Sequence, residues 1–235
     1  MTVCIMRFLF FLFVAFPLSV LAQEKSGRTC RLLFLGASES DPKTLQLHDG
    51  TKSQEVELPR LNFSKFYPLP SGALTLRLLS APLAEGQAPP STAPAAPVAE
   101  TVGDIYLLVS PDPANKTVPV RMQVIDASAD RFKPGQMMWY NLTANDVGGK
   151  VGKQQLVLKA RSRIITDAPA SGNEDYNVNL SYRIAGKDAP YPLCETRWSH
   201  DPGIRTVLFV VNEPGSRAPR VMGFPDQPAN SGKNP

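Results

Sequence analysis

The sequence has almost no helical periodicity, few cysteines and histidines, and a single long hydrophobic run. Its 235 residues include 3 cysteines and 2 histidines, against 23 prolines and 16 glycines. The two histidines, His48 and His200, are too far apart in the chain to form a metal-ligand motif of the usual spacing. Because the 3.6-residue apolar repeat is missing, a helical fold is excluded and an all-β fold is favoured.

Catalytic and cofactor-binding motifs are also missing. The chain holds no Gly-x-Ser-x-Gly elbow, no phosphate-binding loop and no dinucleotide-binding glycine motif. The glycine-rich, basic stretch Gly148–Lys153 joins two strand-like segments, which is typical of a hairpin connection. Asp49 and Asp201 follow the two histidines but belong to turn sequences, which explains them without a catalytic role. We therefore expect no catalytic residue, no metal site and no cofactor, with an enzyme as the less favoured alternative.

Charge of either sign is modest and mixed. The formal net charge is +4, from 25 Lys and Arg against 21 Asp and Glu. A surface that binds nucleic acid needs a dense cluster of basic residues to neutralise phosphates, and no such cluster occurs in this sequence. We expect no nucleic-acid partner.

The one long hydrophobic run lies at the start of the chain. Arg7 is the only charged residue of Met1–Ala22, and it precedes the apolar run Phe8–Phe16. This pattern is typical of a secretory signal peptide. We expect cleavage after Ala22 and a secreted or periplasmic protein, with an uncleaved N-terminal anchor as the alternative. No later run is long enough to span a bilayer, so we expect no membrane anchor after cleavage.

Export would place the remaining cysteines in an oxidising compartment. Cys4 lies in the signal segment, which leaves Cys30 and Cys194. Cys30 does not directly follow the cleavage site, as a lipid-carrying cysteine must. Exported cysteines can pair, so a disulfide between Cys30 and Cys194 is one interpretation, and two separate buried thiols are the other.

Short strand-like segments recur from Cys30 to Phe224, separated by turn residues. In Ala73–Leu79, for example, leucines alternate with Thr75 and Arg77, as expected of a strand with one buried face. Many short strands between frequent turns are typical of sandwiches. We predict an all-β fold of two closely coupled, antiparallel, immunoglobulin-like β-sandwich lobes.

Segments of similar sequence recur in order along the chain, as an internal duplication with insertions would produce. The four matched pairs are Leu35–Asp41 with Ile125–Asp130, Pro70–Gly72 with Ala170–Gly172, Asp104–Ser110 with Arg205–Val211, and Val118–Met122 with Ala218–Met222. From this duplication we predict a first lobe over residues 28–117 and a second over 118–224. Val118–Ile125 resembles segments of both copies, so it could end one sheet and open the next.

Two segments do not have the composition of a core. Residues 81–101 are rich in proline and alanine and hold almost no large apolar side chain. We expect them to form a mobile or polyproline-like loop. The tail, residues 225–235, is polar, and we expect it to be disordered.

Aromatic side chains are the candidate binding residues. Trp139, Tyr140 and Trp198 would stack on sugars or fill a partner's pockets if they were exposed. The alternative, which we favour, is that members of this group pack in the sandwich core.

The segment Arg31–Leu79 resembles a secreted bacterial repeat of uncharacterised function. The resemblance is carried by Gly36–Ser38, Asp41–Pro42, Leu47–Gly50, Tyr67–Gly72 and Leu74–Leu79. The whole chain is also similar to exported proteins of unknown function of the planctomycete and verrucomicrobium type. This resemblance implies a β-sandwich and a bacterial source, and it brings no catalytic residues.

Two functions are compatible with these features. The first is an interaction or scaffold module that binds another envelope protein, and the proline-rich loop would then extend it. The second is a protein that binds or processes a glycan through exposed aromatic residues. The two differ in whether Trp139, Trp198 and His200 converge on one exposed cleft.

Overall fold

The computed structural model describes residues 27–84, 86–213 and 215–227, and this part of the chain contains strands and no helix. The signal segment expected at the start of the chain lies outside the described residues. The strands are β1 (Thr29–Phe34), β2 (Thr44–His48), β3 (Ser53–Glu57), β4 (Tyr67–Pro68), β5 (Leu74–Leu79), β6 (Ala95–Val98), β7 (Ile105–Pro111), β8 (Val120–Asp126), β9 (Met137–Asn141), β10 (Asp146–Val151), β11 (Gln154–Leu158), β12 (Arg163–Thr166), β13 (Glu174–Arg183), β14 (Tyr191–His200), β15 (Arg205–Asn212) and β16 (Pro219–Asp226).

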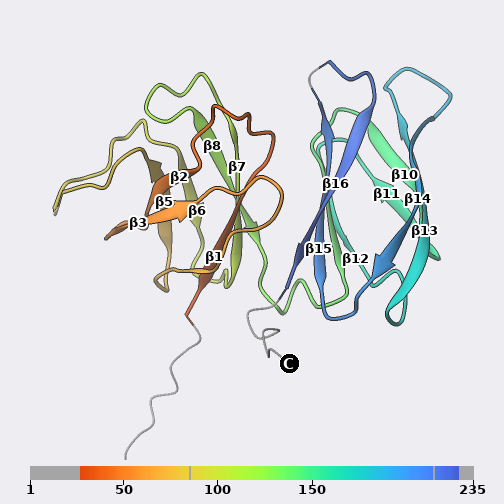
Figure 1. The fold of residues 1–235 in the computed structure, drawn as a ribbon, viewed down its shortest axis with the longest axis horizontal. Coiled ribbons are helices and arrows are strands. Elements are labelled where there is room, and N and C mark those ends of the chain that lie inside the picture. The colour runs from red at the N-terminus through yellow and green to blue at the C-terminus, as the bar shows by residue number, and fades with distance from the viewer. Residues whose placement is uncertain (1–26, 85, 214, 228–235) are drawn as a thin grey trace, which may run out of the picture.

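The strands form four sheets arranged as two sandwich lobes that lie side by side (Figure 1). Lobe 1 consists of an outer sheet, in the order β3-β2-β5-β6, and an inner sheet, in the order β4-β1-β7-β8. Lobe 2 has an outer sheet β11-β10-β13-β14 and an inner sheet β12-β9-β15-β16. The all-β fold of two coupled sandwich lobes, predicted from the turn-punctuated strands, is confirmed.

The strand order of lobe 2 repeats that of lobe 1 strand for strand, with β9 to β16 in the places of β1 to β8. Three of the four sequence matches fall on corresponding elements, namely the turns before β5 and β13, the strands β7 and β15, and the starts of β8 and β16. The match of Leu35–Asp41 with Ile125–Asp130 is wrong, because the first segment follows β1, whereas the second begins with the last two residues of β8.

Each inner sheet departs from a purely antiparallel arrangement. β1 pairs with β7 in parallel, and β9 pairs in parallel with β15, whereas every pair in the outer sheets is antiparallel. A parallel neighbour needs a long crossover, and here each crossover includes the outer sheet of the same lobe. The first and seventh strands of each lobe therefore lie at the centre of its inner sheet.

The central strands of the two inner sheets, β1 and β7 in lobe 1 and β9 and β15 in lobe 2, are buried on both faces over most of their length. Along β7, the side chains of Ile105, Leu107 and Val109 enter the core of lobe 1, while Tyr106 and Leu108 face lobe 2. Such a strand reads as a continuous apolar run because it has no solvated face. The molecule is thus a four-layer stack with a core in each lobe and a third core between the lobes.

The third core, which we call the lobe junction, is as closed to water as the other two. Phe132 and Phe209 have no exposed surface, and Tyr106, Ile125 and Phe224 are exposed by at most 2%. Aromatic rings contact each other across the junction: Phe63 of lobe 1 lies 6.3 Å from Phe224 of lobe 2, centroid to centroid. Burial of this apolar surface favours one fixed placement of the lobes.

Three sequence predictions about segment bounds need correction. β8 pairs only with β7 among the described strands, so it completes lobe 1 and the boundary between the lobes follows Asp126 rather than residue 117. The proline-rich segment 81–101 contains β6, which pairs with β5. Ala96 and Val98 of β6 are buried, because their side chains alternate inward even in this composition.

The third correction concerns the tail. Disorder was expected from residue 225, but β16 continues through Asp226, whose side chain is fully buried. Residues 228–235 lie outside the described part of the chain.

Candidate functional site

The aromatic residues predicted to bind a ligand do not form an exposed surface. Trp139 has no exposed area and lies in the core of lobe 2, where its ring centroid is 6.1 Å from that of Trp198. Tyr140 is exposed by 3% and faces the opposite way, into the lobe junction, where it stacks on Phe209. Trp198 is half-buried and packs against the core of lobe 2. Trp139 and Tyr140 thus pack in the cores of the molecule, which was the favoured alternative, although Tyr140 also lines a groove beside the junction.

The cysteines lie in different lobes. Cys30 is fully buried on β1 in the core of lobe 1, and Cys194 is half-buried on β14 in the outer sheet of lobe 2. Neither forms a disulfide, so the Cys30–Cys194 bridge is wrong and the alternative of two separate thiols holds. Burial raises the pKa of both thiols, and most strongly that of Cys30.

Each histidine–aspartate pair lies where a strand ends in a turn, and the two pairs are in separate lobes. The Nδ1 atom of His48 accepts a hydrogen bond from the Gly50 amide at 3.1 Å. Asp49 accepts bonds from the amides of Thr51 and Lys52, and these bonds close a turn. Within the described ranges, no three His, Cys, Asp or Glu side chains gather in a way that could hold a metal ion.

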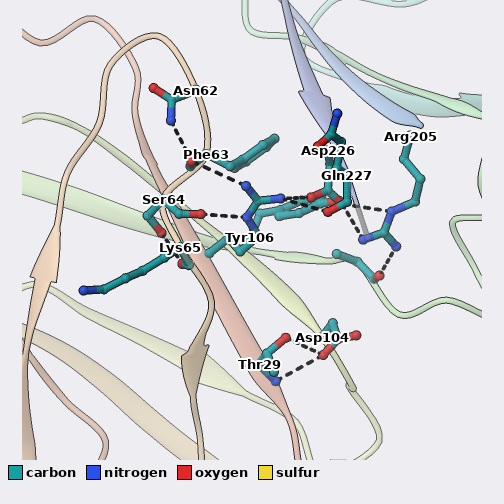
Figure 2. Close-up of polar contacts among 12 residues, drawn as sticks. Thr29, Asn62, Phe63, Ser64, Lys65, Asp104, Tyr106, Arg205, Asp226 and Gln227 are labelled. Carbon is teal, nitrogen blue, oxygen red and sulfur yellow. Dashed lines mark hydrogen bonds and ion pairs between the residues drawn. The ribbon is translucent and has the colours of Figure 1, made fainter. Parts of the chain in front are cut away.

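A buried ionic cluster joins the two lobes at one end of the junction. The carboxylate of Asp226, at the end of β16, accepts hydrogen bonds from Arg31 of β1 and from the phenol of Tyr106 on β7. It also accepts two bonds from Arg205 of β15, at 2.9 Å from Nε and 2.5 Å from Nη2. Figure 2 shows Asp226 between Tyr106 and Arg205.

The cluster satisfies its buried charges almost completely. Arg205 also donates to the carbonyl oxygens of Ala127 and Phe132, in the segment that connects the lobes. Arg31 donates to the Ser64 carbonyl and lies over the ring of Phe63. Burial, with the neighbouring Asp226 carboxylate, raises the pKa of the Tyr106 phenol and keeps it protonated as a donor. A buried charge is tolerated when it is paired and hydrogen-bonded in this way.

Sequence reasoning missed this cluster. Arg31 and Arg205 stand at the starts of strongly apolar strands, which is an unusual place for a charge and could have signalled a buried pair. No sequence signal marked their partner, because Asp226 lies in a polar segment.

A groove opens beside the junction, between the end of β8 in lobe 1 and the strands β9 and β12 of lobe 2. It has a volume of about 260 Å³. Its lining residues are Asp126, Arg131, Met138, Tyr140, Arg163, Ile164 and Ile165.

The groove combines an apolar wall with a surplus of positive charge. Ile164 and Ile165 of β12 are exposed by 39% and 37%. Asp126 is paired with Arg131 at 2.9 Å, whereas the only hydrogen bond of the Arg163 guanidinium within the described residues goes to the Tyr140 phenol, at 3.3 Å. Two guanidinium groups thus stand against one carboxylate, so the groove is suited to an anionic group attached to an apolar one.

A larger hollow at one end of lobe 2 is less suited to a ligand. It has a volume of about 630 Å³ and is lined in part by Glu174, Asp175 and Tyr176. Both carboxylates are already engaged, Glu174 by the Ser171 amide and Asp175 by the Ser199 hydroxyl. Burial raises the pKa of Tyr176 to about 12, so this phenol is neutral at physiological pH.

No family model matches this chain, and no curated protein matches it at a significant level. No helix of the described segments is long and apolar enough to cross a membrane.

Proposed function

We propose that this chain is an exported, non-enzymatic interaction or scaffold module of the periplasm or cell envelope. The observation that carries the proposal is the lobe junction, a third core whose residues come from both lobes. Two sandwiches joined only by a linker would move relative to each other. A buried apolar interface with an ionic cluster at its end instead supports one rigid body that presents its outer surfaces at a set distance.

The structure gives little support to the carbohydrate alternative. That alternative required Trp139, Tyr140 and Trp198 to be exposed together, and two of the three are buried on opposite faces of β9. His200 is buried as well, on β14 of lobe 2, so these residues form no exposed cleft.

Cross-linking in cells that export the chain tests the proposal. A tagged chain is treated with a short amine-reactive cross-linker and purified under denaturing conditions, with an unrelated exported β-sandwich of similar size as the control. We expect at least one envelope protein to be recovered with this chain and not with the control. Recovery of the same proteins with both would contradict the proposed function.

A shortened chain locates the contact. Residues 86–89 lie at the exposed end of the proline-rich loop, before β6, and can be removed while Pro90, whose carbonyl oxygen accepts a hydrogen bond from the amide of the buried Ala93, is kept. If the partner is lost with this variant, the loop makes the contact. If the partner is retained, the contact lies on a sandwich surface.

A further inference from the structure

The wall of the groove is formed by β12, an edge strand with an unpaired side. In the described residues, the backbone of Arg163–Thr166 has hydrogen-bond partners only on β9. The other side of an edge strand presents N–H and C=O groups that a further strand can pair with. Natural proteins usually protect such an edge with prolines, charges or a very short strand.

The two lobes differ at this edge. The strand that corresponds to β12 in lobe 1 is β4, which is reduced to Tyr67–Pro68. Pro68 has no N–H to donate, so this edge pairs poorly with another strand. β12 is longer, contains no proline, and exposes Ile164 and Ile165. This edge is therefore protected in lobe 1 and unprotected in lobe 2.

The charges around β12 indicate what could pair with it. Arg163 begins the strand and Arg131 lies across the groove, while Asp126 neutralises only one of them. Asp167, just beyond the strand, accepts a hydrogen bond from the Gln136 amide group and is not among the residues that line the groove. An acidic side chain on an incoming strand would meet Arg163, and its apolar neighbours, which point to the other face of that strand, would lie on the side of Ile164.

We propose that this groove binds an extended, acidic peptide segment of a partner protein, which adds to β12 as a further strand and places a carboxylate against Arg163. This inference rests on the proposed function, because it names the surface and the partner chemistry of the interaction module. Backbone pairing supplies affinity in this mode of recognition, and the groove selects the side chains. A second copy of the chain fits less well, because it would bring two grooves with the same surplus positive charge together.

Peptide binding tests the inference directly. The probe is the fluorescein-labelled octapeptide SVEVTVES, measured by fluorescence anisotropy with the full chain from Gln23 onward. Two further probes separate charge from backbone pairing, namely SVKVTVKS, which reverses the charges, and SVEPTVES, in which proline blocks pairing. We expect saturable binding of the first peptide and at least about tenfold weaker binding of the other two.

Variants of the protein locate the site. Arg163→Glu should weaken binding of SVEVTVES by about tenfold or more, because it turns an attraction into a repulsion. The matched control is Arg197→Glu, an equally exposed arginine on β14 of the outer sheet, which should leave affinity within about twofold. Absence of binding, equal binding of the lysine peptide, or equal effects of the two variants would each overturn the inference.

Photo-cross-linking in exporting cells separates this inference from the proposed function. Benzoylphenylalanine is placed at Ile165, in the groove, or at Leu61, which is 82% exposed on lobe 1. An adduct at Ile165 that excess SVEVTVES suppresses supports the groove. A specific adduct at Leu61 alone overturns the groove and leaves an interaction module in place. No specific adduct at either position, together with no partner in the amine cross-linking, would overturn both.

Discussion

Asp226 shows how one residue can connect two lobes. Its carboxylate has no exposed surface and is bonded by side chains of β1 and β7 in lobe 1 and of β15 in lobe 2. A buried ion pair adds little net stability when compared with a well-packed apolar pair, but removal of one partner leaves an uncompensated charge. The effect of Asp226 is therefore best measured by removing it.

We expect Asp226→Ala to lower the free energy of unfolding by about 3–5 kcal/mol, because Arg31 and Arg205 would remain buried without their shared anion. Denaturant unfolding at neutral pH measures this loss. The control is Asp130→Ala, which removes an exposed carboxylate of the segment that connects the lobes. A loss no larger than that of the control would show that the cluster does not stabilise the fold.

The cysteines give a second prediction at this scale. In a chain that begins at Gln23, we expect two free thiols after denaturation without a reductant, because Cys30 and Cys194 lie in different lobes. In the folded protein, Cys194 should react with a thiol reagent well before Cys30, which is fully buried and has a raised pKa. A count of no free thiols after denaturation would contradict the separation of the two residues.

At the residue scale, the sequence singled out notable side chains but did not predict where they lie in the structure. It identified Trp139, Tyr140 and Trp198 as notable, but it could not assign their exposure. Neighbours on a strand point to opposite faces, so exposure depends on what covers each face of β9. Here Trp139 enters the core of lobe 2 and Tyr140 enters the junction, and only the packing of the sheets decides this.

Among the elements, the sequence did not predict two strands, β6 and β10, whereas segments that correspond to the other strands were recognisable. β6 contains Pro97 and β10 contains Gly148 and Gly149. These residue types are depleted in strands, and both strands form because their neighbours in the sheet supply the pairing partners. The apolar runs of β7 and β15 did carry a signal of burial on both faces.

Gly149 allows a test at the scale of the element. Its φ is +145°, and a Cβ at this position would lie 2.0 Å from the carbonyl oxygen of Asn179 on β13. Gly149→Ala should therefore destabilise the protein by about 1–3 kcal/mol, through backbone strain and displacement of β13.

Its neighbour Gly148 is the control for this prediction. A Cβ at Gly148 would lie 3.4 Å from the Leu156 carbonyl oxygen, so Gly148→Ala should change the stability by less than about 1 kcal/mol. Thermal unfolding followed by circular dichroism compares the two variants. Equal stabilities would show that β13 yields at this point without cost.

For the whole molecule, the lobe junction predicts that the lobes unfold together. Both tryptophans, Trp139 and Trp198, lie in lobe 2, so their fluorescence reports on lobe 2 while circular dichroism reports on both lobes. We expect the two signals to give the same midpoint in denaturant, as a single cooperative transition requires.

A junction variant of lobe 1 sharpens this prediction. Leu33 is fully buried on the face of β1 that meets lobe 2, and Leu33→Ala should cost about 2–5 kcal/mol. The midpoint of tryptophan fluorescence should fall with it, although the substitution lies in the other lobe. The control is Leu61→Ala, at an exposed position of lobe 1, which should leave the midpoint unchanged. Unaltered fluorescence in the Leu33 variant would mean that the lobes unfold independently.

The sequence by itself determined the all-β fold, the turns and the repeat, because these depend on local preferences and on the period of apolar residues. It did not determine how the lobes meet. That contact depends on the second faces of strands such as β7 and β15, on an aspartate that only the completed β16 brings between two arginines, and on the difference between β4 and β12. These features arise when residues far apart in the chain are packed together, so the tertiary structure decided the junction and the groove beside it.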